Sequence, residues 1–122
     1  MVERHTRATP QGRAVWLTER LWRLAERLPV ERVPIAEIAE LDQDCWFGAA
    51  HAPTIRAVAE HARRIEAADL SRPVILSSDG RLMDGGHRIA KAWLMGLTDV
   101  AAVRFETDPE PDALIADEAP RC

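Results

Sequence analysis

The sequence has few cysteines, few aromatic residues and no long uninterrupted hydrophobic run. Its two cysteines, Cys45 and Cys122, form no Cys-x-x-Cys pair, so a zinc site built on thiolates is excluded and a structural disulfide is not expected. This cysteine usage favours the reducing cytoplasm. The longest apolar-rich stretch, residues 14–28, is interrupted by five charged side chains. We therefore expect no membrane-spanning segment and no membrane partner.

A strong charge of one sign is also missing over most of the chain. The formal net charge is −4, from 16 basic and 20 acidic residues, and six of the acidic residues lie between Glu106 and Glu118. The rest of the chain is nearly neutral. This balance argues against nucleic acid as the partner.

The 122 residues have the length and composition of one globular domain. We divide the chain into three parts. Residues 1–30 are a polar arm followed by an amphipathic helix, and residues 31–106 are the domain proper. Residues 107–122 form an acidic, proline-containing tail that we expect to be disordered.

A first helix is predicted over residues 14–28, because apolar side chains recur there every three or four residues (Ala14, Leu17, Leu21, Leu24, Leu28). Pro29 ends it. The apolar stripe has two interpretations. Either it packs on its own domain, or it forms the seam of a homodimer.

The middle of the chain predicts alternating strands and helices. Residues 32–38 are an edge strand containing Pro34. A second helix runs from Pro53 to near Asp69, with an apolar face of Ile55, Val58, Ala59, Ala62 and Ile65. A hairpin joins strands 73–76 and 81–83, and a third helix, with the apolar face Ile89, Ala90, Trp93 and Leu94, ends at Gly96. With a last strand at 100–105, the predicted class is α+β, a small mixed β-sheet packed with helices.

Two glycines, Gly85 and Gly86, separate the second hairpin strand from the third helix. Glycine lets the backbone approach a ligand closely. The first amides of a helix have no helical acceptor and commonly bind phosphate. The sequence therefore predicts an anion site at this turn, with a plain tight turn as the alternative.

Side chains around the glycines strengthen this prediction. His87, Arg88 and Lys91 fall within about a 100° arc of the helix, so they can converge on one phosphate. Asp84 is suited to hold a metal ion such as Mg²⁺ or to accept a hydroxyl proton. We name Asp84 and His87 as candidate catalytic residues. The alternative leaves Arg88 and Lys91 solvated on an exposed helical face.

Three runs resemble the ParB/sulfiredoxin-like superfamily: residues 70–76 (LSRPVIL), 81–92 (RLMDGGHRIAKA) and 96–100 (GLTDV). In ParB N-terminal domains a Pro-Ile-x-Val strand, a hairpin, a Gly-Glu-Arg-Arg turn opening a helix, and a Gly-Leu-x-x-Val-Pro segment follow one another. The resemblance covers about residues 31–106. It implies a sulfiredoxin-like fold.

The resemblance also implies a ligand. Superfamily members bind nucleotides with the phosphates on the helix N-terminus, and Gly85, His87 and Arg88 match the phosphate-binding positions. ATP or CTP, with Mg²⁺, are the implied cofactors, because relatives use ATP or hydrolyse CTP. The chemistry compatible with this site is phosphoryl transfer or nucleotide hydrolysis, and binding alone is equally compatible.

Gly86 departs from both well-known branches of the superfamily. Sulfiredoxins have their catalytic cysteine there, so a sulfiredoxin-type reductase is excluded, and ParB proteins have glutamate. The Asp-Gly-x-His-Arg form is closer to kinase-like branches. One rival function is a non-catalytic regulatory or adaptor module with a degenerate nucleotide site. Another is a DNA-linked, partition-like role, against which stand the net charge and the lack of a helix-turn-helix segment.

The loop before the second helix carries further candidate ligand contacts. It corresponds in position to the first nucleotide-contacting segment of ParB domains. A base can stack on Trp46 or Phe47, while Asp44 or His51 faces the phosphates. In the alternative interpretation, Trp46 and Phe47 fill the core beneath the loop.

Overall fold

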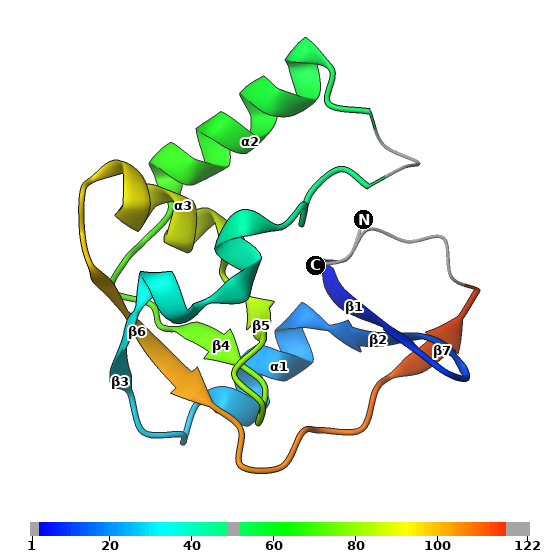
Figure 1. Ribbon diagram of the computed structural model, residues 1–122. Helices are drawn as coiled ribbons and strands as arrows, with labels where there is room; N and C mark the ends of the chain where they lie inside the picture. The colour runs from blue at the N-terminus through cyan, green and yellow to red at the C-terminus, as the bar shows by residue number, and fades with distance from the viewer. Residues whose placement is uncertain (1–2, 49–51, 117–122) are drawn as a thin grey trace.

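The computed structural model describes residues 3–48 and 52–116 (Figure 1). Its α+β fold confirms the predicted class. In chain order the elements are β1 (Arg4–Thr9), β2 (Gly12–Leu17), α1 (Thr18–Ala25), β3 (Glu31–Pro34), two short 3-10 helices (Ile35–Glu37 and Ala39–Asp42), α2 (Ile55–Ala67), β4 (Val74–Leu76), β5 (Leu82–Asp84), α3 (Gly86–Leu94), β6 (Asp99–Arg104) and β7 (Ala113–Ile115). None of the described helices is long and apolar enough to cross a bilayer.

The larger sheet has the strand order β3-β6-β4-β5 and is mixed, as predicted. Strands β4 and β6 are parallel, while the β3–β6 and β4–β5 pairs are antiparallel. Strand β3 lies at an edge, where Pro34 is tolerated. Each face of this sheet carries its own hydrophobic cluster: Val74 and Ala102 belong to one, Ile75 and Val103 to the other.

The N-terminal prediction is wrong in its first half. Residues 4–17 form an antiparallel hairpin, β1 and β2, in place of a frayed arm and the start of a helix. Pro10 and Gln11 form the turn, and Gly12, at φ +129°, begins the second strand. Ala14, Val15 and Trp16 are all buried, which a strand covered on both faces explains and a one-sided helix does not. The helix begins only at Thr18.

The apolar stripe of residues 14–28, for which a homodimer seam was one interpretation, is therefore divided between strand β2 and helix α1. Leu21 is fully buried within the chain's own core, whereas Leu17 and Leu24 are partly exposed. Ala14, Trp16 and Leu21 share a cluster with Ile75 of the larger sheet and with residues Met83, Val103 and Phe105. The N-terminal segment therefore packs directly on residues of the 31–106 region.

The tail is ordered as far as it is described, which corrects the expected disorder for residues 107–116. Strand β7 pairs with β2 and completes a second, three-stranded sheet of order β1-β2-β7. The indole Nε1 of Trp16 donates to the carbonyl oxygen of Pro109 at 2.8 Å. Residues 117–122 lie outside the described part of the chain.

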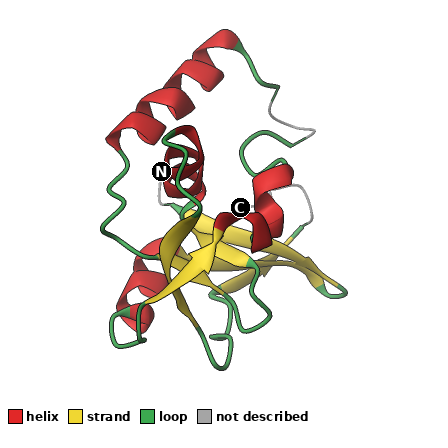
Figure 2. Ribbon diagram, turned by 60° about the vertical axis from the view of Figure 1, so that its left-hand side comes forward, coloured by secondary structure: helices red, strands yellow, loops and turns green. Residues whose placement is uncertain are grey.

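The second and third helices lie close to their predicted positions, but their predicted apolar faces are not all buried. The Thr54 hydroxyl caps α2, accepting from the Ala57 amide, yet α2 has no buried residue and Ile55 is 91% exposed. In α3, Ile89 is buried but Trp93 is 61% exposed. The reason is visible in Figure 2: α2 packs on α3 and lies apart from the sheets.

Candidate functional site

The predicted strand–glycine–helix turn is present. Strand β5 ends at Asp84, Gly85 adopts φ +123°, and α3 begins at Gly86. A Cβ atom on Gly85 would lie 2.5 Å from Cγ1 of Val74, and one on Gly86 would lie 3.3 Å from Nε1 of Trp46. Packing and backbone conformation thus account for glycine at position 85. Trp46 lies directly against the start of the helix at position 86.

The N-terminus of α3 offers backbone donors. The first hydrogen bond of the helix runs from the Ile89 amide to the Gly85 carbonyl, at 3.0 Å. The amides of Gly86, His87 and Arg88 precede it and have no acceptor within the helix. They lie at the positive end of the helix dipole, which favours an anion there.

The Arg88 side chain is engaged by the protein itself. Its Nη2 donates to Oδ2 of Asp84 at 2.7 Å, and its Nη1 donates to the carbonyl oxygen of Pro73 at 2.7 Å. The side chain is only 12% exposed. The hydrogen bonds of Arg88 therefore connect the start of α3 to the start of β4.

Asp84 has a second donor. The indole Nε1 of Trp22 donates to the same Oδ2 atom at 2.7 Å. Since this oxygen accepts two hydrogen bonds and faces the Arg88 cation, Asp84 fits a Mg²⁺ ligand poorly. Among the residues that the structure describes, no three His, Cys, Asp or Glu side chains gather in a metal-binding group.

Lys91 is used as a helix cap. Its Nζ donates to the carbonyl oxygens of Glu66 and Ala68, at 2.9 and 2.8 Å, at the C-terminal end of α2. The side chains of His87, Arg88 and Lys91 thus contact three different parts of the fold. The backbone amides are the donors that α3 presents together.

His87 belongs to an aromatic group that sequence reasoning missed. Its Nε2 lies 2.7 Å from Nδ1 of His61 on α2, within hydrogen-bonding distance. Both imidazole rings stack on Trp46, at centroid distances of 4.8 and 4.7 Å and interplanar angles of 8° and 13°. His61 lies four residues from both Ala57 and Ile65, and this helical spacing, visible in the sequence, places all three on the side of α2 that is half-buried in the structure.

The imidazole of His87 is neutral at pH 7. Burial is the main cause that lowers its pKa to about 4, and the neighbouring His61 and Arg64 side chains lower it further. Burial also lowers the pKa of His61. Two neutral imidazoles can share a hydrogen bond, one as donor and the other as acceptor.

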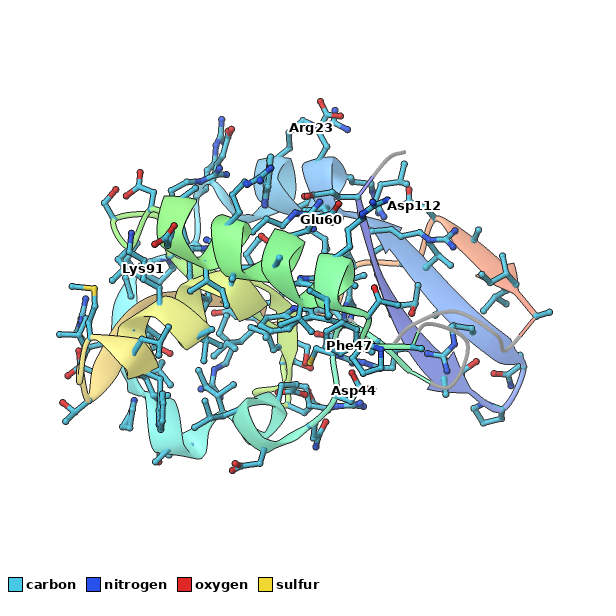
Figure 3. The ribbon with its side chains drawn as sticks, turned by 90° about the horizontal axis from the view of Figure 1, so that it is seen from above. Arg23, Asp44, Phe47, Glu60, Lys91 and Asp112 are labelled. Atoms are coloured by element: carbon cyan, nitrogen blue, oxygen red, sulfur yellow. The ribbon has the colours of Figure 1, made fainter. Side chains whose placement is uncertain are left out.

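Asp44 shapes the loop that carries Trp46. Its carboxylate accepts from the amides of Trp46, Phe47 and Gly48, at 3.2, 2.9 and 2.7 Å. Figure 3 shows Asp44 and Phe47 together in this loop near α2. His51, the other charged candidate of this region, lies outside the described residues.

A cavity of about 280 Å³ lies behind this loop. We call it the aromatic cavity; its wall includes Leu41, Asp44, Trp46, Phe47, Gly86 and Ile89. Trp46 and Phe47 are partly buried and line this cavity, which borders the core residue Ile89. The cavity reaches the N-terminus of α3 at Gly86.

Cys45 corrects the expectation about cysteine, because it is disulfide-bonded. The chain's other cysteine, Cys122, lies outside the described residues. The disulfide removes the argument from cysteine usage for a reducing compartment.

Comparison with known proteins adds no identification, since no family model, no curated protein and no solved structure matches this chain. The class that the fold itself defines is a small α+β protein with two sheets.

Proposed function

We propose that this protein binds a nucleotide or another phosphorylated small molecule that carries a flat ring. The ring occupies the aromatic cavity, and the phosphate lies on the free amides at the start of α3. One observation carries the proposal: Gly86 both begins α3 and lines the aromatic cavity. An apolar slot and a group of anion-binding amides therefore adjoin, which is the combination that such a ligand requires.

The same proposal includes membership of the ParB/sulfiredoxin-like superfamily, with ATP or CTP as the ligand. Support comes from the turn itself, because Asp84, Gly85 and Gly86 have the strand–turn–helix arrangement that the resemblance implied. The cavity volume of about 280 Å³ suits one base. The ring stacks on Trp46 or Phe47.

The contacts of the two candidate catalytic residues favour binding over turnover. Asp84 is held by Arg88 and Trp22. His87 shares its Nε2 with His61 and has a pKa of about 4, so it is a weak base near neutral pH. We therefore place binding first, and phosphoryl transfer or nucleotide hydrolysis second.

A thermal-shift panel tests this proposal. ATP, ADP, CTP and GTP are added with and without Mg²⁺, and a ligand at a hundredfold excess over its Kd should stabilise the fold by about 2.7 kcal/mol. Trp46→Ala should remove base stacking worth about 1–3 kcal/mol. Trp93→Ala is the matched control, because Trp93 is 61% exposed and does not line the cavity.

Two results contradict the proposal. The first is the absence of any shift with all four nucleotides at millimolar concentration. The second is an equal loss of ligand-induced stabilisation in Trp46→Ala and Trp93→Ala. A radiometric or chromatographic assay of nucleotide cleavage on the same samples separates binding from turnover.

A second candidate function is that of an adaptor module, and one observation favours it. Apolar side chains on α2 and at the end of α3 are exposed, including Ile55 (91%), Leu94 (68%) and Trp93 (61%). Exposed apolar groups of this size are typical of protein contact surfaces. If no nucleotide binds, this function takes precedence.

A further inference from the structure

A second cavity lies between the two sheets, beside the edge strands β1 and β5. Its volume is about 280 Å³, and its wall includes His5, Arg7, Arg13, Glu40, Gln43 and Arg81. We call it the arginine pocket. It shares Glu40, Gln43, Cys45 and Leu82 with the aromatic cavity, but none of its lining residues comes from residues 84–91, so it does not reach the α3 terminus.

Positive charge exceeds negative charge in this wall. Three guanidinium groups line the arginine pocket, against the single carboxylate of Glu40. Glu40 is already partnered, since its Oε1 accepts from the Leu82 amide at 3.1 Å and its Oε2 lies 4.0 Å from Nε of Arg81 in the same wall. Burial, and next the charge of Arg81, lower the pKa of Arg7, while the carboxylates of Asp79, Asp108 and Glu40 raise it.

His5 supplies the second observation. Its side chain is only 4% exposed, and neither ring nitrogen has a hydrogen-bond partner. The buried Nε of Arg7 also lacks a partner. Buried polar atoms in proteins are nearly always hydrogen-bonded, because leaving them unpaired is costly.

The two side chains are held in place by the same aromatic ring. The imidazole of His5 lies 5.6 Å from the ring of Trp16, and the Arg7 guanidinium lies 5.8 Å from that ring. Arg7 also donates through Nη2 to Oγ of Ser77 at 3.3 Å. These contacts fix the two side chains at the wall of the arginine pocket.

We propose that the arginine pocket binds the phosphate group of a small phosphate ester, with Arg7, Arg81 and His5 as donors. A guanidinium fork matches phosphate oxygens, and a doubly charged anion balances clustered cations better than a single carboxylate does. The bound phosphate gives partners to His5 and to Nε of Arg7. The pocket exceeds the size of one phosphate group, which leaves room for the group esterified to it.

Calorimetry with inorganic phosphate and glycerol 3-phosphate, at constant ionic strength, tests the proposal. We expect saturable binding of both, with the ester at least as tight as the free ion. Arg81→Gln should weaken binding at least tenfold, because it removes a charge-assisted hydrogen bond. Arg81 is 53% exposed in its side chain, so the variant should fold. Arg32→Gln is the matched control, with a 62% exposed side chain paired to Asp99, and should change affinity less than twofold.

The His5 ring gives an independent readout by nuclear magnetic resonance. In the free protein burial, with the charges of Arg7 and Arg81, lowers its pKa to about 3. Arg13 and Glu40 are the other charged groups in the same wall. Phosphate should raise this pKa, because the anion offsets the cations and accepts from the ring. The signal is assigned by its loss in His5→Gln.

Several outcomes overturn the proposal: no saturable binding of either probe at millimolar concentration, equal effects of Arg81→Gln and Arg32→Gln, acetate binding as tightly as phosphate, or an unchanged His5 pKa. Gly86→Val distinguishes this site from the nucleotide site. It should weaken nucleotide binding at α3 and leave phosphate binding in the arginine pocket unchanged. The two proposals can therefore fail separately.

Discussion

Arg88 matches a phosphate-binding position in sequence, yet its guanidinium group donates to Asp84 and to the backbone of β4. We predict that Arg88→Ala destabilises the free protein by about 1.5–3 kcal/mol, the usual cost of losing a hydrogen bond to a charged group. Urea unfolding measures this loss. Arg32→Ala is the control, since its exposed ion pair with Asp99 should be worth less than about 1 kcal/mol. Equal stabilities of the two variants would refute the structural role of Arg88.

Two histidines should make the fold sensitive to acid. The pKa values of His5 and His87 are lowered to about 3 and about 4, so between these values and 6.5 the unfolded state binds more protons than the folded state. Stability is therefore fully present above pH 6.5 and falls as the pH drops towards 4. Each fully buried group contributes at most about 1.4 kcal/mol per pH unit, and half-exposed His87 contributes less.

The free energy of unfolding, measured in urea from pH 7 to pH 4.5, tests this expectation. His5→Gln should flatten the curve, because its neutral side chain does not titrate. If the free energy of unfolding of the wild-type protein does not change over this pH range, His5 and His87 have the same pKa values in the folded and unfolded states, and the prediction is wrong.

At the residue scale, the sequence predicted where chemistry-bearing side chains lie but not what they contact. Asp84, Gly85 and Gly86 are at the expected turn because a strand and a helix meet there within a few residues. The hydrogen-bond acceptors of Arg88 and Lys91 could not be predicted from local sequence patterns, because Pro73 and Glu66 lie 15 and 25 residues away along the chain. His61 was missed for the same reason.

At the element scale, the turn before α3 contains two glycines with different requirements. Gly85→Ala should destabilise severely, because its Cβ would meet Val74 at 2.5 Å and its φ of +123° is unfavourable for alanine. Gly86→Ala should cost far less, since its Cβ would lie 3.3 Å from the edge of Trp46.

Circular dichroism and thermal melting compare the two variants. Gly96→Ala is the control for a positive φ without a steric conflict, because it has φ +75° and open space around its Cβ position. We expect Gly85→Ala to melt well below Gly96→Ala. Similar melting temperatures would show that Val74 moves aside.

Local patterns predicted the elements whose partners are close in sequence. The β4–β5 hairpin, α3 and its end at Gly96 were all found, and the Gly96 amide donates to the Trp93 carbonyl as a helix end requires. The local pattern predicted the wrong structure for β2, because the apolar residues of 14–28 have helical spacing. Pairing with β1 and β7 makes residues 12–17 a strand despite this spacing.

At the scale of the whole molecule, the C-terminal segment forms hydrogen bonds with both strand β2 of the three-stranded sheet and helix α1. The Asp112 carboxylate accepts from the Leu17 amide at 2.9 Å and from Nη1 of Arg20 at 3.3 Å. These bonds also lower the pKa of Asp112. We predict that Asp112→Ala lowers the free energy of unfolding by about 0.5–1.5 kcal/mol, because its hydrogen bonds are exposed to solvent.

Glu110→Ala is the control, because its side chain is exposed and only its backbone carbonyl accepts from Arg20. Both variants are compared by urea unfolding at pH 7. An equal stability of Asp112→Ala and wild type would mean that the segment from 107 to 116 contributes little, as its composition alone suggested.

The pairing of β2 with β7 has a consequence for how the chain acquires its structure during synthesis. Trp16 and its acceptor Pro109 are 93 residues apart, and β2 is the central strand of its sheet. At about 5–20 residues per second, a ribosome needs several seconds to make the segment between them. During that interval the hairpin of β1 and β2 has one open edge and an uncovered indole. We expect this early hairpin to be the part of the nascent chain that molecular chaperones bind.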